Sequence, residues 1–232
     1  APLSVTDQTT FEIRPGSAFA RVANELGTAG IIEYPRVFSW YARAIGRAGQ
    51  IHAGEYVIAS GKTPVELLDK FVAGEVRLHS FTIVEGWTFR ELLFAMAKHE
   101  AIDSELNYED WPALLDELNV AYDKPEGLFL PETYRFPLGT TDVELLGQAN
   151  SLMSSVLEKE WTERATGLPL SSAYEALILA SIIEKETALA SERPKIAGVF
   201  VRRLQRNMRL PTDPTVIYGI GEHFDGDLTP RH

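Results

Sequence analysis

The chain has 232 residues, 45% of them hydrophobic and 24% charged, a composition typical of a globular protein with one sizeable core or two smaller ones. Its formal net charge is −11, and no cluster of Lys and Arg offsets that charge, so we do not expect a nucleic-acid partner. The absence of cysteine excludes disulfides and thiolate metal sites, and no apolar run approaches the roughly 18 residues of a membrane span.

The first 75 residues predict a small βααβ module with a linking helix. A strand over 10–14 ends at Pro15-Gly16, and Ser17 is the expected N-cap of a helix that continues to residue 26. A second helix is predicted over 35–45 and a second strand over 53–58. Thr63-Pro-Val-Glu66 has the spacing of a capping box and opens a helix to residue 72.

Residues 76–232 predict a second, mixed domain. A strand over 76–84 precedes a second capping box, Thr88-Phe-Arg-Glu91, which opens a helix to about residue 99. A short helix over 111–118 and a Pro- and Gly-punctuated loop over 123–141 follow. Three helices are then expected, over 141–164, 172–190 and 191–206, the last capped by Ser191. The fold class is therefore α+β.

The two ends of the sequence suggest that it belongs to a longer protein. The N-terminal residues have neither the basic nor the apolar region of a secretion signal, so we expect any signal or anchor to lie outside this sequence. The last residues, Thr229-Pro-Arg-His232, fall in a turn-rich segment rather than after a helix or strand. We therefore expect a catalytic domain that is incomplete at its C-terminus.

The apolar segment Ala176–Thr187 ends in two acids, and helical spacing distinguishes them. Residues three and four positions from Glu186 are all apolar, whereas those around Glu184 are smaller and more polar. The neighbours of Glu186 would be Ile182, Ile183, Leu189 and Ala190. Desolvation would raise the pKa of Glu186, and a carboxyl that stays protonated near neutrality can act as the general acid of glycosidic cleavage. A Glu that reaches the surface is the commoner outcome for such a position.

Other catalytic patterns find no support. The five histidines form no His-Glu-x-x-His pair, so we expect no dedicated metal site and no cofactor. No Gly-x-Ser-x-Gly elbow or phosphate-binding loop is present, and Phe224 stands where a dinucleotide fingerprint needs its third glycine. Acids on a helix and on loops remain as the candidates.

Four sequence blocks resemble the MltG (YceG-like) family of endolytic murein transglycosylases. They are Ile83-Val-Glu-Gly86, Glu126-Gly-Leu-Phe-Leu-Pro-Glu-Thr-Tyr134, Ala180-Ser-Ile-Ile-Glu-Lys-Glu-Thr187 with Ser191-Glu-Arg193, and Met208-Arg-Leu-Pro-Thr-Asp-Pro-Thr-Val-Ile-Tyr-Gly219. The blocks occur in the family's order, and the resemblance covers nearly the whole chain. It implies that residues 1–75 are LysM-like and that residues 76–232 are a YceG-like catalytic domain. That domain continues in the family with a Tyr- and Gly/Pro-rich block that this sequence lacks, so part of the groove wall is expected to be missing.

The resemblance implies a lytic transglycosylase that cuts the β-1,4 bond between N-acetylmuramic acid and N-acetylglucosamine. The muramic C6 hydroxyl would attack its own anomeric carbon and leave a 1,6-anhydro end. The family's catalytic acid corresponds to Glu186, the residue that the helical spacing also favours. The expected substrate contacts are Glu126, Glu132, Tyr134, Asp213, Thr215 and Tyr218.

The resemblance also implies a place and partners for the enzyme. It would act on nascent glycan strands at the periplasmic face of the inner membrane, beside peptidoglycan synthases, and would be held by a single-pass anchor that is not part of this chain.

Two alternatives remain open at the level of sequence. The first is a glycan-binding protein without catalysis. The second is a hydrolase that uses water, which needs a second carboxyl, for which Glu132 and Asp213 are the candidates.

Overall fold

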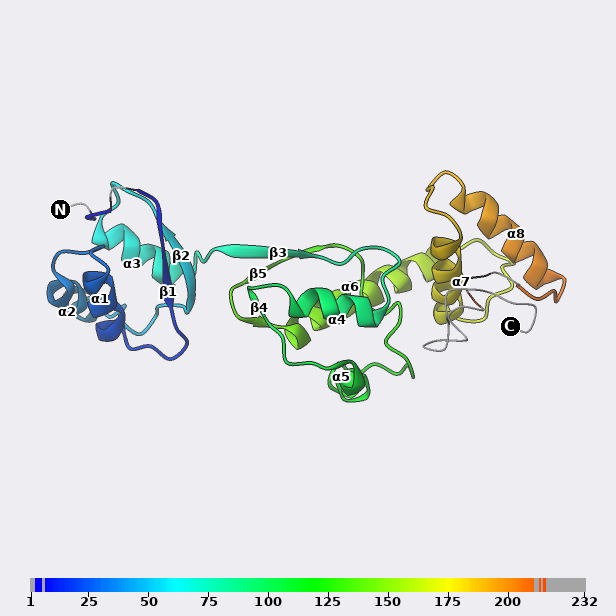
Figure 1. Cartoon of the computed structure of the whole chain (residues 1–232), viewed down its shortest axis with the longest axis horizontal. Coiled ribbons are helices and arrows are strands. Elements are labelled where there is room, and N and C mark those ends of the chain that lie inside the picture. The colour runs from blue at the N-terminus through cyan, green and yellow to red at the C-terminus, as the bar shows by residue number, and fades with distance from the viewer. Residues whose placement is uncertain (1–2, 6, 211–212, 214, 216–232) are drawn as a thin grey trace. The chain divides into compact units, whose positions relative to one another are not determined.

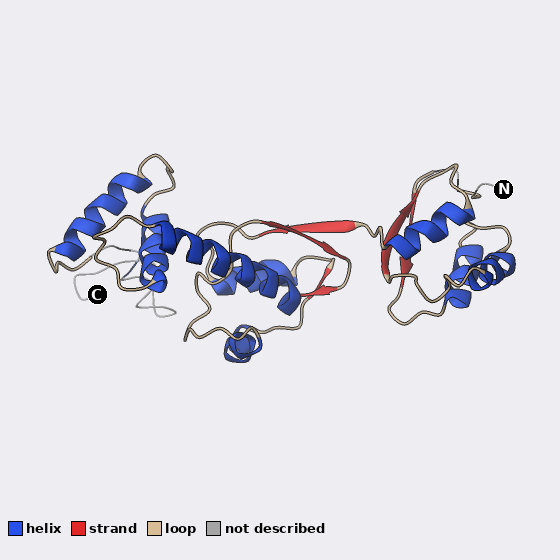
Figure 2. Ribbon diagram, turned by 180° about the vertical axis from the view of Figure 1, so that it is seen from behind, coloured by secondary structure: helices blue, strands red, loops and turns tan. Residues whose placement is uncertain are grey.

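The structure is a computed structural model that describes residues 3–5, 7–210, 213 and 215. It has mixed α and β elements, with helices separated by short two-stranded sheets (Figures 1 and 2). Its contacts divide the chain into two compact units. The N-terminal unit comprises Ala1–Phe81, His99–Ser104 and Arg135–Thr141, and the C-terminal unit comprises Thr82–Lys98, Glu105–Tyr134 and Asp142–His232.

The N-terminal unit begins with the predicted strand–helix–helix–strand order. The elements are β1 (Thr9–Ile13), α1 (Phe19–Thr28), α2 (Pro35–Ala44), β2 (Gly54–Ile58) and α3 (Pro64–Ala73). Strands β1 and β2 are antiparallel, with Thr9 opposite Ile58 and Ile13 opposite Gly54. The predicted capping box of α3 is confirmed, because the Thr63 side chain accepts the Glu66 N–H and Glu66 accepts the Thr63 N–H. Ser17 does not cap α1, whose N-cap is Ala18.

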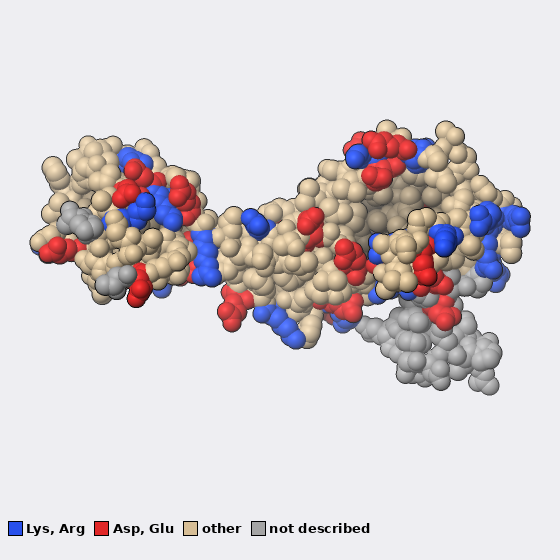
Figure 3. All heavy atoms as spheres, turned by 90° about the horizontal axis from the view of Figure 1, so that it is seen from above, with Lys and Arg blue, Asp and Glu red and all other residues tan. Residues whose placement is uncertain are grey.

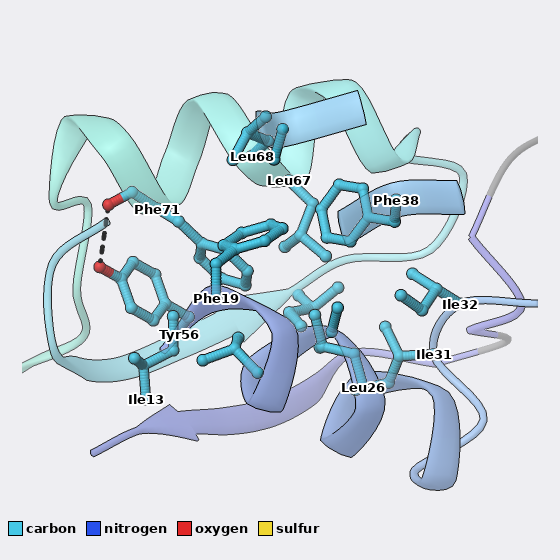
Figure 4. Packing of buried hydrophobic residues seen from close by; sticks show 14 of the residues in the cluster. Ile13, Phe19, Leu26, Ile31, Ile32, Phe38, Tyr56, Leu67, Leu68 and Phe71 are labelled. Carbon is cyan, nitrogen blue, oxygen red and sulfur yellow. Dashed lines mark hydrogen bonds between the residues drawn. The ribbon is translucent and has the colours of Figure 1, made fainter. Parts of the chain in front are cut away.

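The core of this module lies between its helices and its two strands (Figure 4). Phe71 and Tyr56 are fully buried, with ring centroids 4.7 Å apart at an edge-on angle. The Tyr56 hydroxyl donates to the His52 carbonyl at 2.8 Å, so burial of the ring leaves its polar atom satisfied. Every residue in this buried cluster lies between Leu3 and Phe71 in the sequence.

The C-terminal unit is mainly helical. Its elements are α4 (Phe89–Ala97), the short 3-10 helix η1 (Tyr108–Asp110), α5 (Trp111–Glu117), α6 (Asp142–Glu163), α7 (Ala173–Glu186) and α8 (Arg193–Gln205). The stacked rings of Phe89 and Phe129 join α4 to the segment that follows Glu126. That segment is tied to α6 because Leu130 N–H donates to the Ala149 carbonyl at 3.1 Å.

A buried carboxylate fixes the start of α6. Asp142 is only 1% exposed, and one of its oxygens accepts the N–H groups of Glu105 and Leu106 at 2.9 and 2.8 Å. Its other oxygen accepts the Val143 N–H, so the buried charge is well solvated by backbone donors.

Several predicted boundaries change. The segment predicted as a loop over 123–141 contains β5 (Thr133–Pro137), which pairs with β3 (Leu78–Thr82), and β6 (Thr140–Thr141), which pairs in parallel with β4 (Ile102–Asp103). The sequence gives the reason, because Tyr134 and Phe136 alternate with exposed neighbours and bury one face of β5. Helix α8 begins at Arg193, so Ser191 is not its cap.

Candidate functional site

The acid pair Glu184 and Glu186 lies at the C-terminal end of α7. Ser172 caps the start of this helix by accepting the Glu175 N–H. The helix ends at Glu186, because the next residue, Thr187, has an extended backbone with φ −147° and ψ 134°. Thr187 is buried and its hydroxyl donates to a Glu192 carboxylate oxygen at 2.7 Å, which fixes the turn toward α8.

This early helix end corrects the expected surroundings of Glu186. Leu189 and Ala190 lie beyond the helix, so they do not share a helical face with Glu186. Leu189 is 59% exposed and Glu186 is itself exposed. The described residues therefore do not give Glu186 the apolar environment that the spacing predicted. Its catalytic role stays a prediction that rests on the family motif.

Glu184, rather than Glu186, is the more enclosed acid of the pair. Its side chain is 28% exposed, and its two oxygens lie 2.9 and 3.2 Å from Nη2 of Arg193 at the start of α8. This ion pair joins the two helices across the turn, so Glu184 has a structural partner that Glu186 lacks among the ion pairs of the described residues.

The loop between β3 and α4 lies against this end of α7. A methyl group built on Gly86 would lie 3.7 Å from Cγ of Glu184 and 4.0 Å from Nζ of Lys185. Gly86 has φ +76°, a conformation that favours glycine. Two of the sequence blocks, Ile83–Gly86 and the Glu-Lys-Glu segment, are therefore neighbours in space.

The third block reaches the same place through Glu126. One Glu126 oxygen accepts the Phe89 N–H at the first turn of α4 at 2.9 Å. Burial raises the pKa of Glu126, and the negative charge of Glu91 raises it further, while the Phe89 N–H and the positive charge of Lys185 oppose the rise. Glu126 is thus a half-buried acid beside a second carboxylate and an ammonium group.

Glu91 differs from Glu126 in its surroundings. It completes the predicted capping box of α4, where it accepts the backbone N–H of Thr88 at 2.8 Å. Hydrogen bonds from the backbone and hydroxyl of Thr88 lower the pKa of Glu91, and the charge of Lys185 lowers it slightly more. Neighbouring carboxyls whose pKa values move in opposite directions are a recurrent feature of acid–base sites.

The remaining predicted contacts are not all brought together. Glu132 is exposed and its carboxylate accepts the N–H of Thr133. Tyr134 is buried in the core, its hydroxyl donates to the Leu130 carbonyl at 2.6 Å, and burial raises its pKa to about 12. It therefore packs inside the unit and does not line a surface groove, which corrects its expected role. Asp213 is exposed, Thr215 is half-buried, and Tyr218 lies outside the described residues.

Sequence reasoning missed Lys185 and Glu91 as members of this cluster. The capping-box spacing located Glu91 on α4. Only the approach of the Gly86 loop to α7 brings the charge of Lys185 close enough to act on Glu91. No three His, Asp or Glu side chains come together as metal ligands within the described part of the chain. None of the helices described is both long and apolar enough to cross a membrane.

The structure thus defines an α+β protein in which three of the sequence blocks lie near one helix, α7. Comparison with known sequences gives the family: the profile of the YceG-like family matches residues 11–232, and the chain belongs to that family.

Individual relatives share less than a third of their aligned residues with this chain. The chain is 27% identical to an endolytic murein transglycosylase of Bacillus subtilis (strain 168), an alignment that covers 97% of this chain and 67% of the relative. It is 28% identical to an endolytic murein transglycosylase of Streptococcus pneumoniae (serotype 2, strain D39), over 92% of this chain and 43% of the relative. The chain therefore spans about two thirds of one relative and less than half of the other. The crystal structure of a yceG-like protein from Listeria monocytogenes aligns with 98% of this chain and 80% of its own, at a TM-score of 0.49 and 22% identity.

Proposed function

We propose that this chain carries the catalytic region of an endolytic lytic transglycosylase that acts on the glycan strands of peptidoglycan. The observation that supports this most directly is the meeting of three family blocks at α7, where Gly86 approaches Glu184 and Lys185 and where Gly127 approaches Leu177 of the same helix. The family membership and the names of the two relatives agree with the proposal.

The proposed reaction needs one carboxyl group that acts twice. Protonated Glu186 gives its proton to the N-acetylglucosamine oxygen as the C1–O bond breaks, and the resulting carboxylate then takes the proton of the muramic C6 hydroxyl as that oxygen bonds to C1, which returns Glu186 to its starting state. Atoms balance without water, and the product is a 1,6-anhydro end. The exposed position of Glu186 leaves it open to a strand that would itself exclude water on binding.

The other parts of the chain are assigned roles under the same proposal. Residues 1–75 form a LysM-like module, and residues 76–232 form the catalytic domain. Glu126, Glu132, Asp213, Thr215 and Tyr218 remain proposed substrate contacts, whereas the buried Tyr134 is left as a core residue. The place of action is outside the cytoplasm beside peptidoglycan synthases, where nascent strands are limited in length.

The test is product analysis with matched variants. Glu186→Gln should lower the rate of 1,6-anhydro product formation by about 10²-fold or more, measured by mass spectrometry of purified glycan strands. Glu160→Gln, an exposed acid on α6, is the control and should leave the rate unchanged. The same two substitutions and the same expected rates hold if a longer protein that contains this chain is assayed.

The outcomes separate the competing assignments. Anhydro ends at the unmutated rate from Glu186→Gln, together with their loss from Glu126→Gln, would transfer the acid role to Glu126. Reducing ends in place of anhydro ends would indicate a hydrolase. Strand binding without new chain ends would indicate a glycan-binding protein.

A further inference from the structure

Helix α2 presents large apolar side chains to solvent. Val37 is 63% exposed and Trp40 is 70% exposed, and three positions apart they share one face of the helix. Tyr34, at the N-cap and three positions before Val37, is 62% exposed. We call Tyr34, Val37 and Trp40 the α2 face.

The α2 face is not the side by which the helix packs into its module. Phe38 and Ala42 are buried and point into the core, and the Phe38 ring lies 5.1 Å from that of Phe19. They project about a quarter-turn or more away from Val37 and Trp40 on a helix of 3.6 residues per turn. The packing of the module is thus complete without the α2 face, and exposed apolar clusters of this kind mark interaction surfaces.

Two arginines border the α2 face, and the helix carries no acid. Arg36 and Arg43 lie seven positions apart, on the same side of α2, and both are exposed. Neither belongs to an ion pair among the described residues. Glu33 precedes the helix, and its carboxylate accepts a hydrogen bond from the Tyr34 hydroxyl, so one acid lies at the N-terminal edge of the α2 face.

The net negative charge of the chain is not shared by the N-terminal residues that include the α2 face. Residues 1–81 contain eight acids and eight bases, so the net charge of −11 belongs wholly to residues 82–232. On the face drawn in Figure 3, acids and bases are interspersed on the N-terminal unit. A neutral module can approach an anionic surface without the repulsion that the rest of the chain would meet.

From these observations we propose that the α2 face binds the surface of an anionic lipid bilayer. Trp and Tyr have apolar rings with a polar atom and concentrate at the boundary between headgroups and acyl chains. Arg36 and Arg43 would reach the lipid phosphates on one flank while Val37 and Trp40 enter the interface. Both arginines need an anion, which lipid phosphates supply, and the rings of Tyr34 and Trp40 favour the headgroup boundary.

The experiment is co-sedimentation of the full chain with vesicles. One set contains phosphatidylcholine alone and the other contains equal parts of phosphatidylcholine and phosphatidylglycerol. We expect binding to the anionic vesicles that weakens as salt is added. The double variant Val37→Ser, Trp40→Ser should lower the partition coefficient about tenfold or more. Replacing Arg36 and Arg43 with Gln should lower it about fivefold for each arginine on anionic vesicles only.

The control is Val65→Ser, which removes an exposed valine from α3 of the same unit and should bind as the unmodified chain does. Because all the altered side chains are exposed, circular dichroism should report an unchanged fold for every variant. Absence of vesicle binding at low salt, or equal binding by the double variant, would overturn the proposal. Two further outcomes would overturn it, each with vesicle binding retained by the double variant. The first is that the double variant no longer pellets with insoluble peptidoglycan, and the second is that it no longer self-associates in sedimentation velocity. None of these readouts depends on catalysis, so a failure here is distinct from a failure of the proposed transglycosylase.

Discussion

At the scale of single residues, the degree of burial distinguishes acids that look equivalent in the sequence. Glu126 and Glu186 both lie in family blocks, but Glu126 accepts a backbone N–H and is half-buried, whereas Glu186 is exposed. Helical spacing alone assigned the desolvated environment to Glu186. The structure assigns it to Glu126, whose carboxylate is half-buried against the first turn of α4.

The raised pKa of Glu126 makes stability depend on pH in a defined direction. A carboxyl whose pKa rises on folding binds its proton more tightly in the native state, so its favourable contribution is fully present below the ordinary pKa near 4.5 and is lost as the pH rises through the raised value. Glutamine keeps an acceptor for the Phe89 N–H and does not titrate. We expect the free energy of unfolding of Glu126→Gln, relative to the unmodified chain, to increase between about pH 4 and about pH 7.

Urea unfolding across that pH range measures this difference, with Glu160→Gln as the exposed control. A constant difference between Glu126→Gln and the unmodified chain at every pH would show that Glu126 is not desolvated on folding.

At the scale of elements, the ends of helices decide what the site contains. The capping box of α4 places the Phe89 N–H toward Glu126 and holds Glu91 at the first turn. The extended Thr187 ends α7 directly after Glu186 and turns the chain into α8. A shift in either helix end would separate Lys185 from the two carboxylates.

The cap of α4 can be tested by removing one hydroxyl. Thr88→Ala removes the acceptor of the Glu91 N–H, and it should lower the free energy of unfolding by about 1 kcal/mol. Thr162→Ala is the matched control, because that exposed hydroxyl only donates to the Glu158 carbonyl within α6 and should change stability by less than about 0.5 kcal/mol. Thermal or urea unfolding compares the two, and equal losses would mean that the Thr88 cap is not formed in solution.

At the scale of the whole molecule, the N-terminal module has a core of its own. Its buried cluster draws only on residues between Leu3 and Phe71, and the hydrophobic side chains packed around it extend no further than Val76. A core assembled from one continuous stretch needs no contribution from the rest of the chain. The domain boundary at residue 75 remains a prediction, because the compact N-terminal unit also includes residues 76–81, His99–Ser104 and Arg135–Thr141.

Independent folding of the module is therefore expected. A fragment of residues 1–77 should unfold cooperatively in urea, and Phe71→Ala should lower its free energy of unfolding by about 3–5 kcal/mol, because Phe71 is fully buried. In the full chain, Phe94→Ala serves as the control, since Phe94 is largely exposed and its removal leaves no cavity. A fragment without a cooperative transition would place essential core residues beyond position 77.

The sequence by itself determined the order of the helices and of strands β1 to β3, both Thr capping boxes and the family blocks, because these depend on local spacing and on side-chain-to-backbone bonds a few residues long. Alternation in Thr133–Pro137 also carried the signal for β5, although the prolines and glycines around it suggested a loop. Only the tertiary structure decided that Tyr134 is a core residue, that Glu184 pairs with Arg193, and that Glu126, Glu91 and Lys185 share one cluster. Burial and electrostatic fields depend on which distant segments pack together, and spacing along one helix does not contain that information.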